Sequence, residues 1–170
     1  ILVADGVDSA SLKPIREAIE AAGARCKVIG LRLGTVTSAS KRQIDIDATF
    51  TNMPSIMFDA VLVPAGKESA EALSRSGDAV HFLLEAFKHC KAICTVGEGA
   101  GLLSTLGLGL GTGKADSGVA RSGVTGVVIA ATPATNMGDL TAAHQVARDF
   151  IAAIAKHRHW DRADIDAVPA

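Results

Sequence analysis

Short apolar runs alternate with helical patterns along most of the chain. The runs that predict buried parallel strands lie at residues 1–4, 26–31, 59–64, 92–96 and 127–130. Between them, apolar residues recur at helical spacing, most clearly in residues 11–22, 77–90 and 139–154. Strands that alternate with helices predict an α/β fold: a doubly wound, mostly parallel sheet with helices on both faces.

Residues 35–50 interrupt this pattern, because apolar and polar residues alternate there with a period of two. Thr35-Val36-Thr37 and Gln43-Ile44-Asp45-Ile46-Asp47 flank a polar turn at Ser38–Lys41. This predicts a small, half-exposed hairpin inserted at the sheet edge. We expect one domain over residues 1–170, with a short helical turn at 53–57 and a loop-rich stretch between residues 97 and 126, which holds ten glycines.

Three polar residues predict where helices begin. Ser11 is the expected N-cap of the first helix, with Pro14 in its first turn. Gly77-Asp78 opens the next clear helix, whose expected buried stripe includes Val80, Leu83 and Phe87. Asp139 is the expected cap of the last helix, and the tail from residue 158 onward is expected to be a polar surface segment.

Composition narrows the function. Of the 170 residues, 48% are hydrophobic and 21% charged, so the chain forms a packed domain rather than a disordered one. The 17 Lys and Arg nearly balance the 18 Asp and Glu, and only 4% of residues are aromatic. Neither nucleic acid nor an anionic membrane is therefore an expected partner, and no apolar run approaches the ~18 residues of a membrane span.

Three cysteines, Cys26, Cys90 and Cys94, form no C-x-x-C pair. A sparse, odd number of cysteines indicates free thiols in a reducing compartment, hence a cytoplasmic protein. The first residue, Ile1, lies within an apparent strand, which suggests a piece of a longer chain.

The loops after the strands are where ligands bind in such sheets. The first of these loops presents Asp5 and Asp8, which repel phosphate, and no dinucleotide or P-loop glycine pattern is present, so we expect no flavin or nucleotide. The histidines show no metal-ligand spacing; His157 and His159 are interpreted as surface residues. Asp45 and Asp47 are interpreted as a solvated strand face.

Cys94 is the residue with the clearest alternative interpretations. It lies near the end of an apolar strand before a glycine turn, where a nucleophile at a strand-to-helix elbow would be. The simpler interpretation is a buried, inert thiol, and no histidine follows in the next turn to activate it.

Several stretches resemble a known family. The order of elements and Ala92-Ile93-Cys94 resemble the DJ-1/PfpI superfamily, which is flavodoxin-like and related to class I glutamine amidotransferases. A closer resemblance is to the C-terminal domain of large-subunit catalases, and it spans nearly the whole chain. The stretches that carry it are 5–10, 58–66, 77–79, 85–91, 155–162 and the end at 165–170.

The resemblance to catalases implies a flavodoxin-like appendage of a homotetrameric haem enzyme that converts hydrogen peroxide to water and oxygen. It implies that the haem and its Tyr ligand belong to an upstream core; this chain contains no Tyr. The implied partners are that core and sister subunits, and the implied role is structural or stabilising, with a chaperone-like holding of unfolded clients as a further expectation. The domain itself would bind no cofactor and no metal.

The resemblance to DJ-1/PfpI proteins implies an alternative: a cysteine hydrolase, glyoxalase or deglycase that uses Cys94. In that family the nucleophilic Cys is followed by one residue and then Gly. Counting back from Gly97 predicts Thr95 at the tip of a vestigial elbow, with Cys94 buried and unreactive. Ser11 aligns with the family's helper carboxylate, and Glu98 follows the elbow. A third alternative is a flavin-binding electron carrier.

Overall fold

The computed structural model describes residues 1–105, 119–121, 124–130, 140–163, 165 and 168. Four strands form the central sheet, in the order β5 (Ala60–Val63), β6 (Ala92–Val96), β8 (Val127–Ala130) and β7 (Val119–Arg121). The pairs β5–β6 and β6–β8 are parallel, and β7 runs antiparallel to β8 at the edge. The strands predicted at 92–96 and 127–130 are confirmed; β7 was not predicted.

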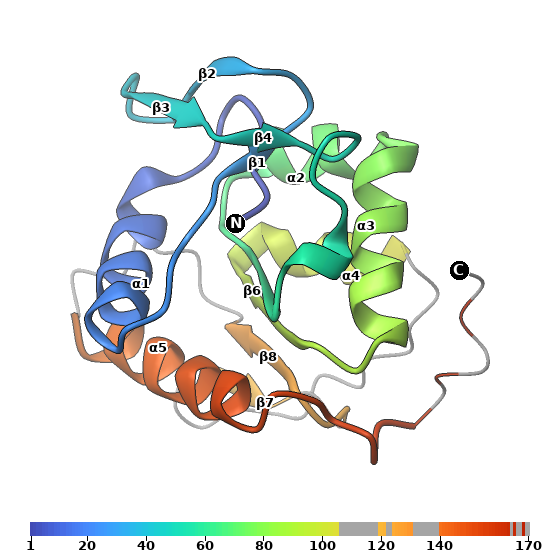
Figure 1. Ribbon diagram of the computed structural model, residues 1–170. Helices are drawn as coiled ribbons and strands as arrows, with labels where there is room; N and C mark the ends of the chain where they lie inside the picture. Colours follow the sequence, from blue (N-terminus) through green and yellow to red (C-terminus); the bar gives the residue numbers. More distant parts are fainter. Residues whose placement is uncertain (106–118, 122–123, 131–139, 164, 166–167, 169–170) are drawn as a thin grey trace.

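The first residues of the chain lie beside β5, at the edge of this sheet that is opposite to β7 (Figure 1). The Leu2 N–H donates to the Leu62 carbonyl on β5 at 2.9 Å, and the Val3 N–H donates to the Ile29 carbonyl at 3.0 Å. The chain start thus lies between β5 and β1 (Ile29–Gly30), which pairs in parallel with β4 (Ala48–Thr49). The second predicted strand is therefore shorter than residues 26–31.

The predicted hairpin is confirmed. Strand β2 (Gly34–Thr37) pairs antiparallel with β3 (Gln43–Ile46), and both project above the sheet in Figure 1. Val36 and Ile46 are buried against Val3, Val7 and Val28, so one face of the hairpin has a small core of its own. The alternation of exposed and buried residues follows from this one-sided packing.

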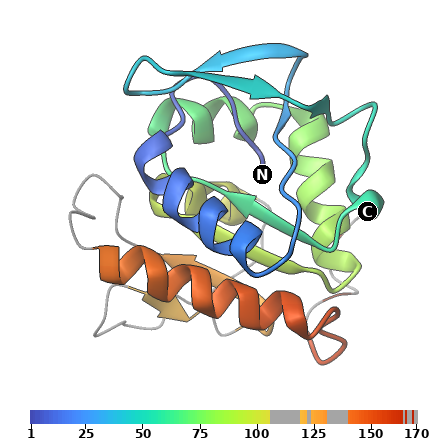
Figure 2. The same cartoon turned by 60° about the vertical axis from the view of Figure 1, so that its left-hand side comes forward.

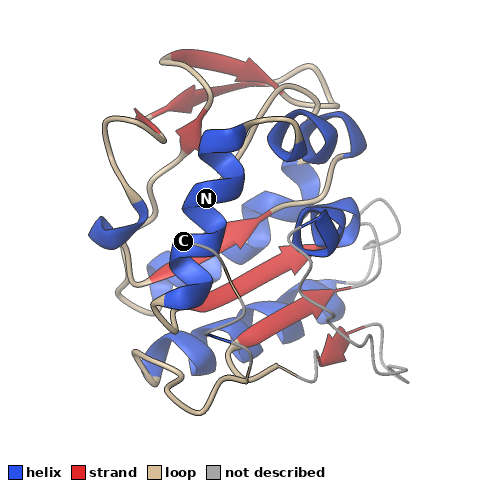
Figure 3. Ribbon diagram, turned by 90° about the vertical axis from the view of Figure 1, so that its right-hand side faces the viewer, coloured by secondary structure: helices blue, strands red, loops and turns tan. Residues whose placement is uncertain are grey.

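Helices cover both faces of the sheet, as predicted (Figures 2 and 3). One face carries α1 (Ser9–Ala21) and α5 (Leu140–Ala155), which lie side by side. The other face carries α2 (Lys67–Ser74), α3 (Gly77–Lys88) and α4 (Ala100–Thr105). The 3₁₀ turn η1 (Ser55–Met57) lies between β4 and β5, and the 3₁₀ turn η2 (Gly97–Gly99) joins β6 to α4.

Each face has its own core. Ile15 of α1 and Phe150 of α5 pack with Leu62 and Cys94 on one side of the sheet. Leu83 and Phe87 of α3 pack with strand and α4 residues on the other side, in a cluster that includes Val61, Val63, Ile93, Leu102 and Leu103. Successive strand residues alternate between these two cores because strand side chains alternate in direction.

Several local predictions need correction. The N-cap of α1 is Asp8, whose Oδ1 accepts the Ala10 N–H at 2.9 Å; Ser11 already lies within the helix. Helix α2 was not predicted; it has only eight residues and begins directly after the loop that follows β5. Val80 is only partly buried. The predicted cap at Asp139 and most of the glycine-rich stretch lie outside the described residues.

The tail after α5 is not a polar surface segment throughout. His159 is 3% exposed and Arg162 is 4% exposed, so the interpretation of His159 as a surface residue is wrong. The Arg162 guanidinium donates to the carbonyls of Phe87 at 2.7 Å, Lys91 at 2.6 Å and Thr125 at 3.0 Å. It also lies 4.6 Å above the centre of the Phe87 ring. The tail is therefore anchored by acceptors that are distant in the sequence.

Candidate functional site

The elbow after β6 is the natural place to look for chemistry, because ligands bind beyond the carboxyl ends of parallel strands. Strand β6 continues through Val96, which pairs with Ala130, and the backbone turns at Gly97 with a φ of +52°. The prediction of Thr95 at the elbow tip therefore needs correction, since Thr95 still lies within the strand. The tip is Gly97, two residues further along.

Gly99 decides how this turn aligns with the sequence pattern of Cys, one residue and Gly that the resemblance to DJ-1/PfpI proteins implies. A Cβ on Gly99 would lie 2.7 Å from the carbonyl oxygens of Val63 and Pro64, so only glycine fits there. The pattern of nucleophile, one residue and glycine then falls on Gly97, Glu98 and Gly99. The position of the nucleophile is occupied by a residue with no side chain.

Cys94 lies three residues before the elbow tip and is fully buried. It sits opposite Leu62 and Val128 in the sheet and packs in the core beneath α1 and α5. Burial raises the pKa of the Cys94 thiol well above its usual value, because a thiolate would be desolvated there, and the Asp149 charge adds to this effect. The expected burial of Cys94 is confirmed; its lack of reactivity stays a prediction.

Thr95 faces the opposite side of the sheet from Cys94 and is also fully buried. Among the described residues, its Oγ1 atom has no hydrogen-bond partner. A substrate at the carboxyl edge of the sheet cannot reach a hydroxyl held within the strand. The geometry therefore gives Thr95 no place in a reaction.

Ser11 and Glu98, the other two candidates, have structural contacts. Ser11 is 0% exposed, and its Oγ donates to the Asp8 carbonyl at 2.9 Å, which keeps it inside the first turn of α1. Glu98 is exposed, and its Oε2 accepts the Gly66 N–H at 3.1 Å. The Ser11 hydroxyl thus bonds within its own helix, whereas Glu98 ties the elbow to the loop after β5.

Several loops meet at this edge and bind one another. The Asp8 N–H donates to the Ala65 carbonyl at 2.8 Å, and the Gly6 N–H donates to the Thr37 carbonyl at 2.8 Å. The Thr37 N–H in turn donates to Asp5 Oδ1 at 2.7 Å. Gly66, with a φ of +125°, lies so close that a Cβ on it would be 2.5 Å from the Gly6 oxygen. The polar groups here hold the loops in place.

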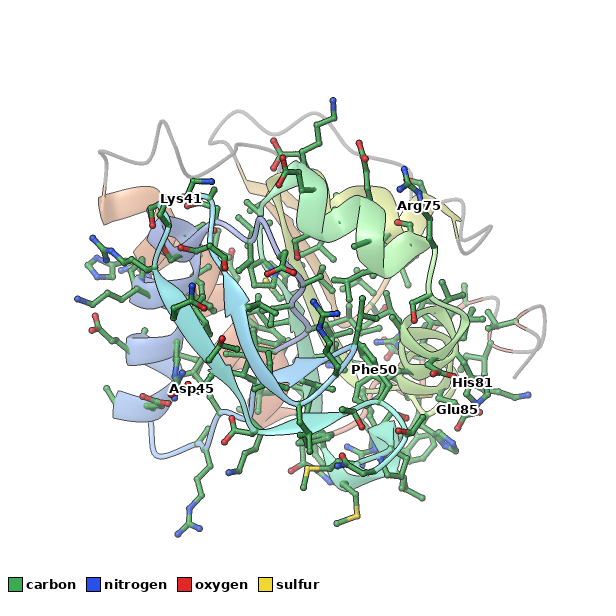
Figure 4. All side chains as sticks on the ribbon, turned by 90° about the horizontal axis from the view of Figure 1, so that it is seen from above. Lys41, Asp45, Phe50, Arg75, His81 and Glu85 are labelled. Carbon is green, nitrogen blue, oxygen red and sulfur yellow. The ribbon has the colours of Figure 1, made fainter. Side chains whose placement is uncertain are left out.

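A polar cleft of about 620 Å³ lies among these loops. Four carboxylates and two lysines line it, namely Asp5, Asp8, Glu68, Glu98, Lys41 and Lys67. Figure 4 shows the molecule from above, with the hairpin toward the viewer: Lys41 lies at the turn of the hairpin, on the opposite side of the view from His81 and Glu85 of α3. Neither cysteine nor histidine is among the lining residues, and Thr37 and Ser38 are the hydroxyl side chains among them.

The described residues contain no group of three or more His, Cys, Asp or Glu side chains placed to hold a metal ion. The helices in the described part of the chain include none that is long and apolar enough to cross a membrane. Asp45 and Asp47 are both exposed, as expected of a solvated face, and the Asp47 carboxylate also accepts the Val28 N–H at 2.7 Å and a hydrogen bond from Lys27 Nζ at 3.0 Å.

Comparisons with known proteins agree with the resemblance found in the sequence. A family model described as the C-terminal domain found in long catalases matches residues 1–164. Catalase HPII of Pseudomonas putida is 40% identical over 172 residues, which cover 100% of this chain and 20% of that relative. Catalase HPII of Mycobacterium avium is 36% identical, and the match covers 100% of this chain and 23% of that relative. The chain spans about a fifth of these relatives.

Among solved structures, a mutant of a DJ-1 superfamily protein from Salmonella typhimurium matches with a TM-score of 0.74 at 17% identity. The match covers 99% of this chain and 97% of that protein. At this identity the likeness shows the fold alone, and it confirms the predicted flavodoxin-like, DJ-1/PfpI-like architecture.

Proposed function

Because this chain belongs to the family of C-terminal domains found in long catalases, we propose that it is the non-catalytic terminal part of a haem catalase that converts hydrogen peroxide to water and oxygen. The observation that carries the non-catalytic assignment is Gly97: the turn where the resemblance to DJ-1/PfpI proteins would place a nucleophile has a positive φ and no side chain. Burial of Cys94 supports it, because the nearest thiol cannot reach the cleft.

The residues of this chain do not fit a haem. The sequence contains no Tyr, the iron ligand that the resemblance to the catalase family implies. We propose that the haem belongs to a catalase core upstream in the same chain, since the chain spans only 20% of the Pseudomonas putida relative. No step of the peroxide reaction is assigned to this domain.

We propose that the domain stabilises the subunits of a catalase tetramer through contacts with the core and with sister subunits. A packed core on both faces of the sheet supports this role, because such a domain can offer a rigid surface. Holding of unfolded clients is the further proposal, supported by exposed apolar side chains at Ile56, Met57 and Trp160. Free thiols at all three cysteines support a cytoplasmic location.

The test compares the long catalase with a version that ends before Ile1. We expect the turnover of peroxide at the haem to be retained, while the half-life at elevated temperature becomes shorter and the tetramer dissociates more readily. Equal half-lives and equal tetramer stability would overturn the stabilising role. Suppression of the aggregation of a heat-denatured enzyme, measured by light scattering with and without the domain, tests the holding of clients.

Labelling of thiols separates this proposal from a cysteine hydrolase. Peptide-resolved mass spectrometry follows modification of Cys94 in the folded protein near neutral pH, with partly exposed Cys26 as the internal control. We expect Cys26 to react while Cys94 does not react until the protein unfolds. Rapid modification of Cys94 in the folded protein would restore the hydrolase.

A further inference from the structure

An apolar groove of about 430 Å³ lies at the amino-terminal edge of the sheet, opposite the polar cleft. Its walls come from both cores: Ile19 of α1 and Phe150 and Ile154 of α5 on one side, Met53 and Phe58 on the other. Met57, at its mouth, is 66% exposed. Ile1 also lines this groove, so the chain start leads directly into it.

The hydrogen bonds of the first residues show how a preceding segment would run. On the β1 side, one residue of the neighbouring strand makes two bonds: the Ile29 carbonyl accepts the Val3 N–H at 3.0 Å, and the Ile29 N–H donates to the Ile1 carbonyl at 2.8 Å. This is parallel pairing, in which one residue bonds to two residues that are two positions apart on its neighbour.

On the β5 side, the same geometry points beyond the first residue. The Leu62 carbonyl accepts the Leu2 N–H at 2.9 Å. Because the N–H and C=O of a strand residue point to the same side, the Leu62 N–H also faces this segment. Its parallel partner is the carbonyl two positions before Leu2, which belongs to the residue that precedes Ile1.

We propose that the residues preceding Ile1 in the longer chain continue this strand along β5 and fill the apolar groove. The inference rests on the proposed function, because it requires that the domain follow a catalase core. Side chains on an extended segment alternate in direction. The residue before Ile1 then points as Leu2 does, toward Met53 and Phe58, and the one before it points toward Phe150 and Ile154.

The chemistry at Ile1 suits a peptide rather than a charged terminus. The Ile1 nitrogen donates to the Lys27 carbonyl at 2.8 Å, as a strand N–H would. Burial lowers the pKa of the Ile1 amino group to about 6, since the ammonium form is desolvated there. A peptide nitrogen at the same place carries no charge and keeps the bond to Lys27.

The experiment uses the long protein and maps limited proteolysis around Ile1 by mass spectrometry. We expect the residues directly before Ile1 to resist cleavage in the unaltered protein. Met57→Glu, which places a charge at the mouth of the groove, should raise cleavage there about tenfold by favouring local release of the segment. The matched control is Leu33→Glu, because Leu33 is 60% exposed but does not line the groove. The control should leave cleavage unchanged.

Each other outcome overturns the proposal. Rapid cleavage directly before Ile1 in the unaltered protein would show that the segment is free. Equal effects of Met57→Glu and Leu33→Glu would show that the groove does not hold it. Dissociation of the oligomer by Met57→Glu, with cleavage near Ile1 unchanged, would assign the groove to a second subunit.

Hydrogen exchange at the Leu62 amide is the second readout. Met57→Glu should accelerate this exchange, and Leu33→Glu should not, if the preceding carbonyl accepts the Leu62 N–H. Both readouts follow the position of the segment and are independent of heat inactivation. If the domain proves not to stabilise the catalase, the placement of the segment before Ile1 can still be tested. If the segment before Ile1 proves not to be protected from cleavage, the proposed stabilising role is unaffected.

Discussion

The two ends of the sheet differ in what their loops do. At the carboxyl end, loops bond to one another around a polar cleft, and the elbow presents Gly97, which has no side chain. At the amino end, an apolar groove lies open beside Ile1, and buried Arg162 fixes the tail nearby. The contrast teaches that polar groups at one end of a sheet can bind its loops to one another, while the other end of the same sheet leaves apolar side chains exposed.

The comparison predicts that changes near the amino end weaken folding more than changes at the carboxyl end. The largest effect is expected for Phe87→Ala. Phe87 is 1% exposed and supports both the α3 core and the Arg162 guanidinium, so its removal should cost about 3–5 kcal/mol of unfolding free energy. Urea denaturation measures this loss. Ile56→Ala, at a side chain that is 69% exposed, is the control and should change little. A loss below about 1 kcal/mol for Phe87→Ala would mean that this face of α3 is misplaced.

Arg162→Ala is expected to have the next largest effect. It leaves three carbonyl acceptors without their donor and removes the cation above Phe87, which should cost about 3 kcal/mol of unfolding free energy. Arg148→Ala, on the exposed face of α5, is the matched control and should stay within about 0.5 kcal/mol. Equal effects of the two substitutions, measured by thermal and chemical unfolding, would contradict the anchoring of the tail.

Glu98→Ala should have a smaller effect, about 1 kcal/mol, because it removes one acceptor from the Gly66 N–H at the exposed carboxyl end. Glu98→Gln keeps an oxygen acceptor and should retain most of the stability. If Glu98→Ala destabilises the protein more than Arg162→Ala does, the contrast between the two ends is wrong.

The smallest effect concerns pH. Burial lowers the pKa of His159 in the folded protein, although its bond to the Ala153 carbonyl opposes this. The unfolded chain therefore binds more protons than the folded one near the ordinary pKa of 6.5, and stability should fall as the pH decreases through and below that value. Urea unfolding at a series of pH values measures the slope, which His159→Gln should reduce. An unchanged slope in His159→Gln would assign the dependence to other groups, such as the Ile1 amino group.

The sequence predicted most of the regular fold because β5, β6, β8 and α3 carry strong local patterns. It missed α2, since only Ala70 and Leu73 mark an apolar face in a short helix. It missed the burial of His159 and Arg162 for a different reason. Their partners lie as far as 75 residues away, so no local pattern in the tail could show them.

At the candidate site, Cys94 was correctly expected to be buried, whereas the elbow was placed two residues too early. The stretch 94–99 allows two alignments with the family pattern, and counting back from Gly97 rather than from Gly99 selected the wrong one. Only the φ of Gly97 and the close approach of Gly99 to the β5 carbonyls decide between them. Both backbone features depend on tertiary packing, so the spacing of residues in the sequence could not predict them.

Gly97 also indicates how few changes would place a reactive side chain at the elbow. Some glycine codons become cysteine codons through a single nucleotide change, and the left-handed backbone at φ +52° is already formed. A side chain in that conformation would cost about 1–3 kcal/mol, which a domain with a packed core on each face of its sheet can tolerate. The resulting thiol would lie next to Glu98, which lines the existing cleft of about 620 Å³. Gly97 therefore offers protein engineers a ready point for installing a nucleophile.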